Sequence, residues 1–144
     1  MENEMRLEIK SKSCNDSFAR IAVAAFVTEL NPTIEEISDI KTAVSEAVTN
    51  SIVHGYEENE GTIHINCKTY DRTVEIQIID YGKGIENVEL AKQPLYTTKP
   101  ELDRSGMGFT IMENFMDDFK IESITGVGTK IIMKKYIKEV VWLN

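Results

Sequence analysis

The segment from Asp39 to Gly55 has the periodicity of an α-helix with two chemically different faces. At about 100° per residue, most of its apolar side chains fall within one stripe, as expected for a helix that packs against a core. Extended back by one turn, the stripe comprises Ile37, Ile40, Val44, Ala47, Val48, Ser51 and Ile52. Glu46 and Asn50 lie one turn apart on the opposite face. The chain therefore has to cover one side of this helix with a second layer, while a carboxylate and a carboxamide project from the other side.

The sequence also marks where this helix begins and ends. Thr33 followed by Glu36 is the pattern of a capping box, and Gly55 offers the left-handed backbone conformation that commonly terminates a helix. We therefore expect a helix over residues 34–54. An acid and an amide on an outward helix face are most often solvated surface, so the rest of the chain has to decide whether this pair forms a site.

Length, charge and cysteine content limit the classes of protein that remain. The chain has 144 residues, enough for one sizeable core, and we expect a single domain over residues 1–144. The net charge of −8 argues against direct binding to nucleic acid, because a phosphate backbone attracts clustered Lys and Arg. Cys14 and Cys67 are too few for a disulfide framework or a zinc site, which favours a cytoplasmic protein. The apolar run 21–27 is too short to span a membrane, and we expect no membrane association.

Alternation and helical spacing predict the remaining elements. Apolar and polar side chains alternate, as in half-buried strands, over residues of about 5–11, 63–67, 74–78, 119–124 and 129–137. A helix is expected before Asn31-Pro32, with an apolar stripe formed by Phe18, Ile21, Ala22, Ala25 and Phe26. Another helix is expected from Phe109, after an irregular segment that reads as a lid. This order predicts an α/β two-layer sandwich, with a largely antiparallel mixed sheet and helices on one face.

Three glycine-bearing stretches lie between these elements. They are Asp80-Tyr81-Gly82-Lys83-Gly84 after a strand, Gly106-Met107-Gly108-Phe109 before a helix, and Gly126-Val127-Gly128-Thr129 in a hairpin. Glycine permits a close approach of the backbone to a ligand, and a glycine turn before a helix presents amide groups to phosphate. Each stretch alone is a weak indication. The sequence has no glycine followed by Lys-Ser or Lys-Thr at the spacing of a P-loop, so a nucleotide would need another scaffold.

Taken in order, the Glu46 and Asn50 pair and the three glycine stretches resemble the motifs of the GHKL superfamily, whose ATP-binding fold DNA gyrase and histidine kinases share. The resemblance spans nearly the whole chain and implies the Bergerat-type fold with an ATP lid over about 81–108. It implies that Asn50 helps to hold Mg²⁺ and that Asp80 accepts a hydrogen bond from the adenine amino group, roles that suit an amide oxygen and a carboxylate. The other ATP-binding residues that it implies are Gly82, Gly84, Ile85, Lys99, Gly106, Gly108, Phe109 and Thr129.

Residues 45–56 and 93–117 narrow the resemblance. Both stretches are similar to the anti-sigma F factors of endospore-forming bacteria, a family of serine-protein kinases. This similarity implies a sporulation protein that binds and inhibits an RNA polymerase sigma factor of the sigma-F type. It also implies that the protein uses ATP to phosphorylate a serine of a small anti-anti-sigma factor, and that it forms a homodimer.

The same resemblance suggests which residues carry out the phosphotransfer. Glu46 would orient or accept the proton of the partner's serine, while Mg²⁺ and cations of the lid stabilise the transferring phosphoryl group. Arg104 and Lys99 are the evident lid cations, and Arg104 is favoured because it adjoins the glycine stretch at 106. Arg20 is a basic residue on a helix of an acidic protein, which makes it a candidate contact for a partner.

Other functions remain open. A histidine-kinase catalytic domain would need an attached helical segment that carries the phosphorylated histidine, and we expect no such segment here. An ATP-gated module would bind the sigma factor without phosphotransfer, but Glu46 argues against it. A sister anti-sigma kinase of the stress-response type is also possible, although residues 93–117 favour the sporulation family. A plain interaction domain would require four ordered motifs to arise by coincidence.

Overall fold

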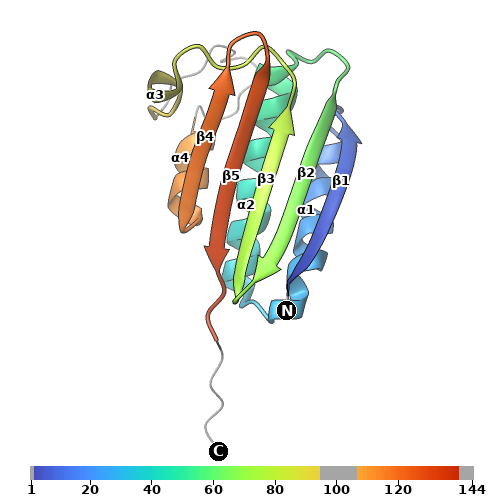
Figure 1. Ribbon diagram of the computed structural model, residues 1–144, viewed down its shortest axis with the longest axis vertical. Coiled ribbons are helices and arrows are strands. Elements are labelled where there is room, and N and C mark those ends of the chain that lie inside the picture. Colours follow the sequence, from blue (N-terminus) through green and yellow to red (C-terminus); the bar gives the residue numbers. More distant parts are fainter. Residues whose placement is uncertain (1, 95–106, 140–144) are drawn as a thin grey trace, which may run out of the picture.

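The computed structural model of the protein describes residues 2–94 and 107–139, which form two packed layers (Figure 1). One layer is a five-stranded sheet in the order β1-β2-β3-β5-β4, and each neighbouring pair of these strands is antiparallel. The strands are β1 Asn3–Lys10, β2 Thr62–Tyr70, β3 Thr73–Asp80, β4 Asp118–Ile124 and β5 Gly128–Tyr136. The helices are α1 Asn15–Val27, α2 Ile34–Asn50, α3 Val88–Ala91 and α4 Gly108–Phe115, with a 3-10 turn at Thr28–Leu30 and a π-helical turn at Ser51–Gly55.

The second layer consists of α1, α2 and α4, which cover the same face of the sheet (Figure 1). The inward-facing side chains of the central strands are almost completely buried; they include Ile63, Ile65, Ile76, Ile78, Ile131 and Met133. The predicted two-layer sandwich is confirmed, although these five strands form a wholly antiparallel sheet rather than a mixed one. Within the described residues, no helix is long and apolar enough to cross a membrane.

The other face of the sheet carries a row of side chains that alternate in charge. The strand register places Glu4, Lys68, Glu75, Lys134 and Asp118 side by side across the five strands. The carboxylate of Glu75 lies 3.7 Å from the ammonium groups of both Lys68 and Lys134. Opposite charges on neighbouring strands favour this register, each pair by about 0.2–1 kcal/mol. Charged side chains on this face thus pair with one another across the strands.

The apolar stripe predicted for α2 is confirmed. Ile40, Val44, Ala47 and Val48 have no exposed surface, and α2 packs between α1 and α4. The capping box is confirmed as well. Oγ1 of Thr33 accepts a hydrogen bond from the Glu36 N–H at 3.1 Å, and Oε1 of Glu36 accepts one from the Thr33 N–H at 2.8 Å. The start of α2 is thus fixed by its own sequence.

The continuous helical segment ends at Gly55, one residue from the predicted limit, but the predicted conformation of Gly55 is wrong. Gly55 does not terminate the helix in a left-handed conformation; it is the last residue of the π-helical turn Ser51–Gly55. The positive φ angles come later, at Glu57 (52°) and Glu58 (63°). Glycine stands at position 55 for a steric reason, because a Cβ atom there would lie 2.9 Å from the carboxylate of Asp80. A contact with a distant strand, rather than local capping, therefore explains this residue.

The apolar stripe predicted for α1 is also wrong. Ala19, Val23 and Val27 form the buried face, whereas Phe18 and Ile21 are 53% and 60% exposed. The inward face of α1 meets both α2 and the sheet, and small side chains let the helix approach both closely. The larger apolar side chains are left on the outside of the molecule.

The carboxylate of Glu36 fastens the start of α2 to the segment that leaves β5. Oε2 accepts a hydrogen bond from the Lys138 N–H at 2.9 Å, and the residue is 7% exposed. Burial raises the pKa of Glu36, but the hydrogen bonds from Thr33 and Lys138, together with the charge of Lys135, outweigh burial, so the pKa lies below its usual value. The ionised side chain therefore stabilises the fold.

Replacing Glu36 with Ala should lower the free energy of unfolding by about 2–3 kcal/mol at pH 7, because a helix cap and an acceptor for a backbone N–H are lost together. The neighbouring exposed variant Glu35→Ala should cost less than about 0.5 kcal/mol. Since the folded-state pKa of Glu36 is lowered, its stabilisation is present above the pKa of the unfolded chain and is lost as the pH falls through the folded-state pKa. Urea denaturation should therefore show the difference between wild type and Glu36→Ala narrowing from pH 7 to pH 3. A difference that does not narrow would contradict this account.

Candidate functional site

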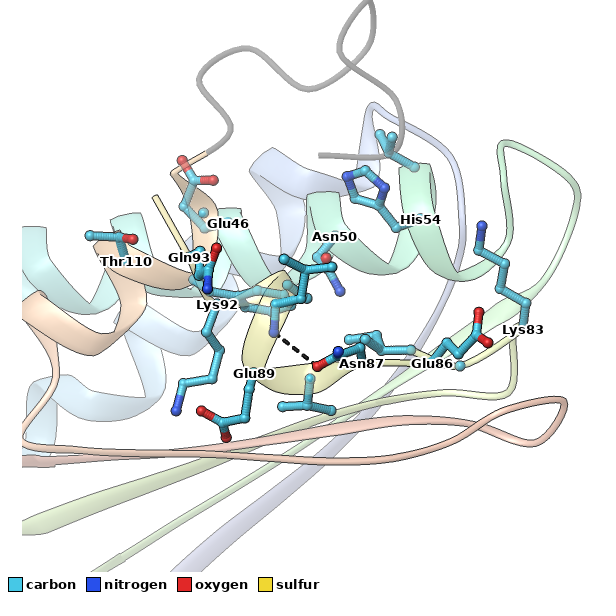
Figure 2. Close-up of a pocket in the computed structure, with 18 of the residues that line it drawn as sticks. Glu46, Asn50, His54, Lys83, Glu86, Asn87, Glu89, Lys92, Gln93 and Thr110 are labelled. Carbon is cyan, nitrogen blue, oxygen red and sulfur yellow. Dashed lines mark hydrogen bonds between the residues drawn. The ribbon is translucent and has the colours of Figure 1, made fainter. Parts of the chain in front are cut away.

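A cavity of about 780 Å³ lies between the outward face of α2, the loop that follows β3 and the start of α4 (Figure 2). This volume is within the range of about 300–1,000 Å³ that is typical of pockets for small ligands. Part of its lining consists of residues predicted from the sequence: Glu46, Asn50, Gly84, Ile85, Gly108 and Phe109. The fold thus brings Glu46 and Asn50 together with two of the three glycine stretches.

α4 forms one end of the cavity, and Glu46 lies at that end. A Cβ atom built on Gly108, the first residue of α4, would lie 3.1 Å from Oε2 of Glu46. Glycine at this position therefore leaves room for the carboxylate beside the helix terminus. The N-terminus of a helix carries partial positive charge and amide donors, which attract anionic groups such as phosphates. The carboxylate of Glu46, which could act as a base, therefore lies beside the N-terminus of α4, which could bind phosphate.

Asp80 is held at the end of β3 and is 2% exposed. Its Oδ2 accepts a hydrogen bond from the hydroxyl of Ser51 at 2.8 Å, and its Oδ1 accepts one from the N–H of Gly82 at 3.0 Å. Burial raises the pKa of Asp80 above its usual value, and the donors from Gly82, Ser51 and Thr129 offset that effect only in part. Asp80 and Gly82 lie behind the cavity wall rather than in it. The predicted contact of Asp80 with adenine and the predicted contact of Gly82 with the nucleotide stay predictions.

The loop after β3 approaches the end of α2 so closely that only glycine fits. A Cβ atom at Gly82 would lie 2.1 Å from the carbonyl oxygen of Gly55. The same carbonyl accepts a hydrogen bond from the Lys83 N–H at 2.9 Å. The backbone of this loop is thus fastened to the π-helical turn, which fixes the position of Asp80 relative to Asn50.

The turn between β4 and β5 supports the loop from its other side. The N–H of Gly126 donates to the carbonyl of Lys83 at 2.7 Å, and the N–H of Ile85 donates to Oγ of Ser123 at 2.7 Å. Oγ of Ser123 also lies 2.9 Å from Oγ1 of Thr129. Thr129 is therefore buried beneath the loop and does not line the cavity, so its predicted contact with a nucleotide is untested.

Other assignments fall partly outside the described residues. Lys99, Arg104 and Gly106 lie there, together with the middle of the predicted lid. The described part of the predicted lid contains α3, which Asn87 caps by accepting a hydrogen bond from the Leu90 N–H at 3.0 Å (Figure 2).

Arg20 lies away from the main cavity, in a smaller groove of about 490 Å³ between α1 and α2. The groove is also lined by Ile34, Ile37, Ser38, Lys41, Thr42, Ser45 and Glu46. Glu46 thus lines both the cavity and the groove. Of the predicted site residues that the structure describes, Glu46 alone borders both hollows.

Several cavity residues were not assigned from the sequence: Thr49, Val53, Lys83, Asn87, Lys92 and Thr110. Thr49 and Val53 follow Glu46 and Asn50 at helical spacing, so the outward face of α2 could have indicated them. Lys83 belongs to a glycine stretch. Lys92 and Thr110 had no sequence signal of their own.

The described part of the chain contains no group of three His, Cys, Asp or Glu side chains that could hold a metal ion. The amide oxygen of Asn50 is nevertheless a hard ligand of the kind that Mg²⁺ accepts, and it lines the cavity on the same helix face as Glu46. In nucleotide sites, phosphate and water usually complete the coordination of Mg²⁺. This set of donors fits a metal that enters with a nucleotide better than a resident metal centre.

The chain belongs to the family of histidine kinase-like ATPase domains, whose family model matches residues 16–135. Its fold is similar to that of the catalytic domain of the histidine kinase ThkA, with a TM-score of 0.56 and 17% sequence identity. The similarity covers 92% of this chain and 96% of the other. The GHKL fold inferred from the sequence is thereby confirmed, and membership of an ATPase family implies that this chain binds ATP.

Curated relatives define the group more narrowly. Proteins named anti-sigma F factor from Clostridium acetobutylicum, Clostridium novyi and Priestia megaterium are 58%, 56% and 55% identical to this chain. The matches cover 94%, 96% and 95% of this chain and 94%, 97% and 95% of the respective relatives. The narrower resemblance, drawn from residues 45–56 and 93–117, is thus confirmed.

The close approach of Gly82 to Gly55 can be tested against another glycine. Gly82→Ala should lower the free energy of unfolding by about 2–3 kcal/mol and weaken ATP binding, because the loop has to move away from α2. Gly126→Ala is the matched control: φ is 81° there, but a Cβ atom would meet nothing within 4 Å, so we expect a loss of about 1 kcal/mol. Urea denaturation and titration with a fluorescent ATP analogue measure both effects. Equal losses in the two variants would mean that the contact with Gly55 is not decisive.

Proposed function

We propose that this protein is an ATP-dependent serine-protein kinase that phosphorylates a small anti-anti-sigma factor. We further propose that it binds and inhibits an RNA polymerase sigma factor of the sigma-F type during sporulation. The observation that supports the kinase activity is the position of Glu46, which lines both the cavity and the surface groove beside Arg20. A carboxylate shared by a nucleotide pocket and an open surface can act on a hydroxyl group supplied by a partner. The name of the relatives suggests the partner class, and transcription as the target implies action in the cytoplasm.

In the proposed complex, the adenine of ATP lies toward Asp80 and the phosphates lie toward Glu46 and α4. The carboxylate of Asp80 accepts hydrogen bonds from Ser51, Gly82 and Thr129, and its two oxygens together keep one further lone pair for the adenine amino group. Gly84 and Ile85 would form the wall near the base, and the start of α4 would donate backbone N–H groups to phosphate. Gly82, Lys99, Gly106 and Thr129 complete the proposed nucleotide contacts.

Asn50 would hold Mg²⁺ together with the phosphates, and the metal would supply positive charge near the transferring phosphoryl group. Glu46 orients the hydroxyl of the partner's serine and accepts its proton. The serine oxygen then bonds to the γ-phosphorus while the bond from that phosphorus to the β–γ bridging oxygen breaks and releases ADP. Arg104, assisted by Lys99, is proposed to balance the negative charge that develops during this transfer.

The groove beside Glu46 offers a path for the partner's serine. Arg20 and Lys41 contribute positive charge to it, while Ser38, Thr42 and Ser45 contribute hydroxyl groups. On a chain with a net charge of −8, such a local positive region favours the approach of an acidic segment. We therefore assign Arg20 to contact with a partner.

Glu46→Gln tests the division between binding and chemistry. The variant should bind ATP within about threefold of wild type, while phosphotransfer to a purified anti-anti-sigma factor should fall by about 100-fold or more. Isothermal titration with ATP and transfer of labelled phosphate measure the two properties, and Glu35→Gln on the same helix serves as the control. Loss of ATP affinity equal to the loss of phosphotransfer would contradict the role of Glu46. If wild type transfers no phosphate but binds the sigma factor more tightly with ATP, the ATP-gated module is correct instead.

We also propose that the protein forms a homodimer in which β1 pairs with β1 of a second copy. β1 is an edge strand, and its unpaired backbone groups offer a template for another strand. The N–H of Ser11 donates to Gly61 O at 2.9 Å. The backbone N–H and C=O groups of the odd-numbered residues of this segment therefore point toward β2, and those of the even-numbered residues point toward the open edge. Beside this edge, α1 exposes the apolar side chains of Phe18 and Ile21, which a second copy could cover.

The charges of β1 select a register for this pairing. Antiparallel pairing centred on Leu7 sets Glu4 opposite Lys10 and Arg6 opposite Glu8, so each outward side chain meets an opposite charge. A shift by two residues in either direction sets Arg6 opposite itself or Glu8 opposite itself. Within one copy, Arg6 and Glu4 lie 3.5 Å apart with side chains 80% and 63% exposed, a contact too weak to prevent this exchange.

A charge swap tests the interface. Arg6→Glu alone should raise the dimer dissociation constant by about tenfold or more, because two symmetric ion pairs become repulsive. Glu8→Arg alone should do the same, and the double variant Arg6→Glu with Glu8→Arg should restore dimerisation. Sedimentation velocity at low ionic strength measures the dissociation constants. A double variant that dissociates as readily as the single variants would exclude this register.

A further inference from the structure

Tyr56 immediately follows the π-helical turn and joins segments that are distant in the sequence. Its hydroxyl donates a hydrogen bond to the carbonyl of Thr62 at 2.6 Å and accepts one from the N–H of Tyr81 at 2.8 Å. Its ring packs on Gly61, where a Cβ atom would lie 2.5 Å from the ring. The hydroxyl therefore has a fixed position and links the start of β2 to the residue after Asp80.

This link is one of three successive attachments between the end of α2 and the loop after β3. Ser51 donates to Asp80, Tyr56 accepts from Tyr81, and the carbonyl of Gly55 accepts from Lys83. The first holds a side chain, whereas the other two hold the backbone on either side of Gly82. A functional group has to be held within about 0.5 Å of its productive position to act effectively. The backbone attachments supply such a constraint for the carboxylate of Asp80.

Tyr56 is itself held by its surroundings. Its N–H donates to Ser51 O at 2.9 Å, and its carbonyl accepts from the N–H of Asn59 at 2.9 Å. The next part of the loop is tied to β1, because Oγ of Ser11 donates to Asn59 O and accepts from the Gly61 N–H, each at 2.9 Å. Burial raises the pKa of Tyr56 above its usual value, so its hydroxyl keeps its proton at neutral pH. The phenol is thus a rigid support and not a mobile surface group.

We propose that Tyr56 is a positioning residue for adenine recognition: its hydroxyl fixes the backbone of Tyr81 and thereby the orientation of the Asp80 carboxylate. This inference rests on the proposed contact between Asp80 and adenine. Tyr56 does not line the cavity, so it acts through Asp80 and not on the nucleotide itself. Guanine presents a carbonyl oxygen where adenine presents an amino group, so a misplaced carboxylate should reduce the preference for ATP over GTP.

Tyr56→Phe removes both hydrogen bonds and keeps the ring that packs on Gly61. We expect ATP affinity to fall at least fivefold, the scale of one lost hydrogen bond, and the ATP-over-GTP preference to fall at least threefold. The control is Tyr136→Phe. Tyr136 is an exposed tyrosine near the opposite end of the sheet, and the variant removes the hydrogen bond of 2.7 Å that its hydroxyl donates to Asp118. It should leave both quantities within twofold of wild type. Isothermal titration with ATP and GTP measures them.

A second measurement needs no ligand. Hydrogen exchange at the Tyr81 N–H should be at least tenfold faster in Tyr56→Phe than in wild type, after correction for any change in global stability. If the nucleotide preference falls by less than threefold, or if exchange at Tyr81 is unchanged, Tyr56 contributes stability alone and the inference is wrong.

Asp80→Asn separates this inference from the proposed function. If that variant loses the ATP preference while Tyr56→Phe keeps it, the adenine contact stands and the role of Tyr56 is excluded. If Asp80→Asn also keeps the preference, the adenine contact itself is excluded, and the inference fails with it. If wild type binds no ATP, the proposed kinase function fails first.

Discussion

The contact between the carbonyl of Gly55 and the backbone of Gly82 is the constraint on which the site depends. The space that a side chain at position 82 would occupy is already filled by this carbonyl. Because neither residue has a Cβ atom, the loop after β3 can lie directly against the end of α2. That approach lets Ser51 reach Asp80 and Gly55 O accept from Lys83. Without it, the sheet and α2 would still pack, but the loop that follows Asp80 would not be fixed beside Asn50.

The π-helical turn Ser51–Gly55 prolongs α2 toward this contact. Such turns occur mostly as single interruptions of α-helices, and often at functional sites. Here the turn continues directly from Asn50 and ends at Gly55. The N–H of the next residue, Tyr56, still donates to the carbonyl of Ser51. The helix face that carries Glu46 and Asn50 therefore leads without a gap into the residues that hold the loop after β3. The proposed metal ligand, the proposed base and the residues that support the loop all come from one continuous segment.

The parts of the structure that the sequence predicted are those governed by local physics. The stripe of α2, its capping box and the alternating strands follow from periodicity and hydrogen-bonding capacity, and they were found close to where they were expected. Gly55 was misinterpreted because a glycine after a helix usually caps it, whereas this one makes room for Asp80, which lies in β3. The prediction of the buried face of α1 was wrong for a related reason. Both faces of α1 contain apolar residues, and only the packing of neighbouring elements determines that Ala19 and Val23 face inward. Lys92 and Thr110 reach the cavity through tertiary arrangement alone, which no single-sequence pattern reports.

The two ends of the cavity are formed by different parts of the fold, and this arrangement bears on how one chain could serve the two proposed partners. The end near Asp80 is fastened by Ser51, Tyr56 and the turn between β4 and β5, so it presents a fixed surface to a ligand. The other end is formed by the start of α4 and by Glu46, which also lines the groove beside Arg20. If adenine occupies the fixed end, ATP and ADP are held there in the same way, and the two nucleotides differ only at the end that adjoins the groove. The terminal phosphate would then alter the charge next to the partner surface without altering how the nucleotide is anchored. Under the proposed function, the protein would bind one partner in its ATP state and release it after transferring the phosphate to the other.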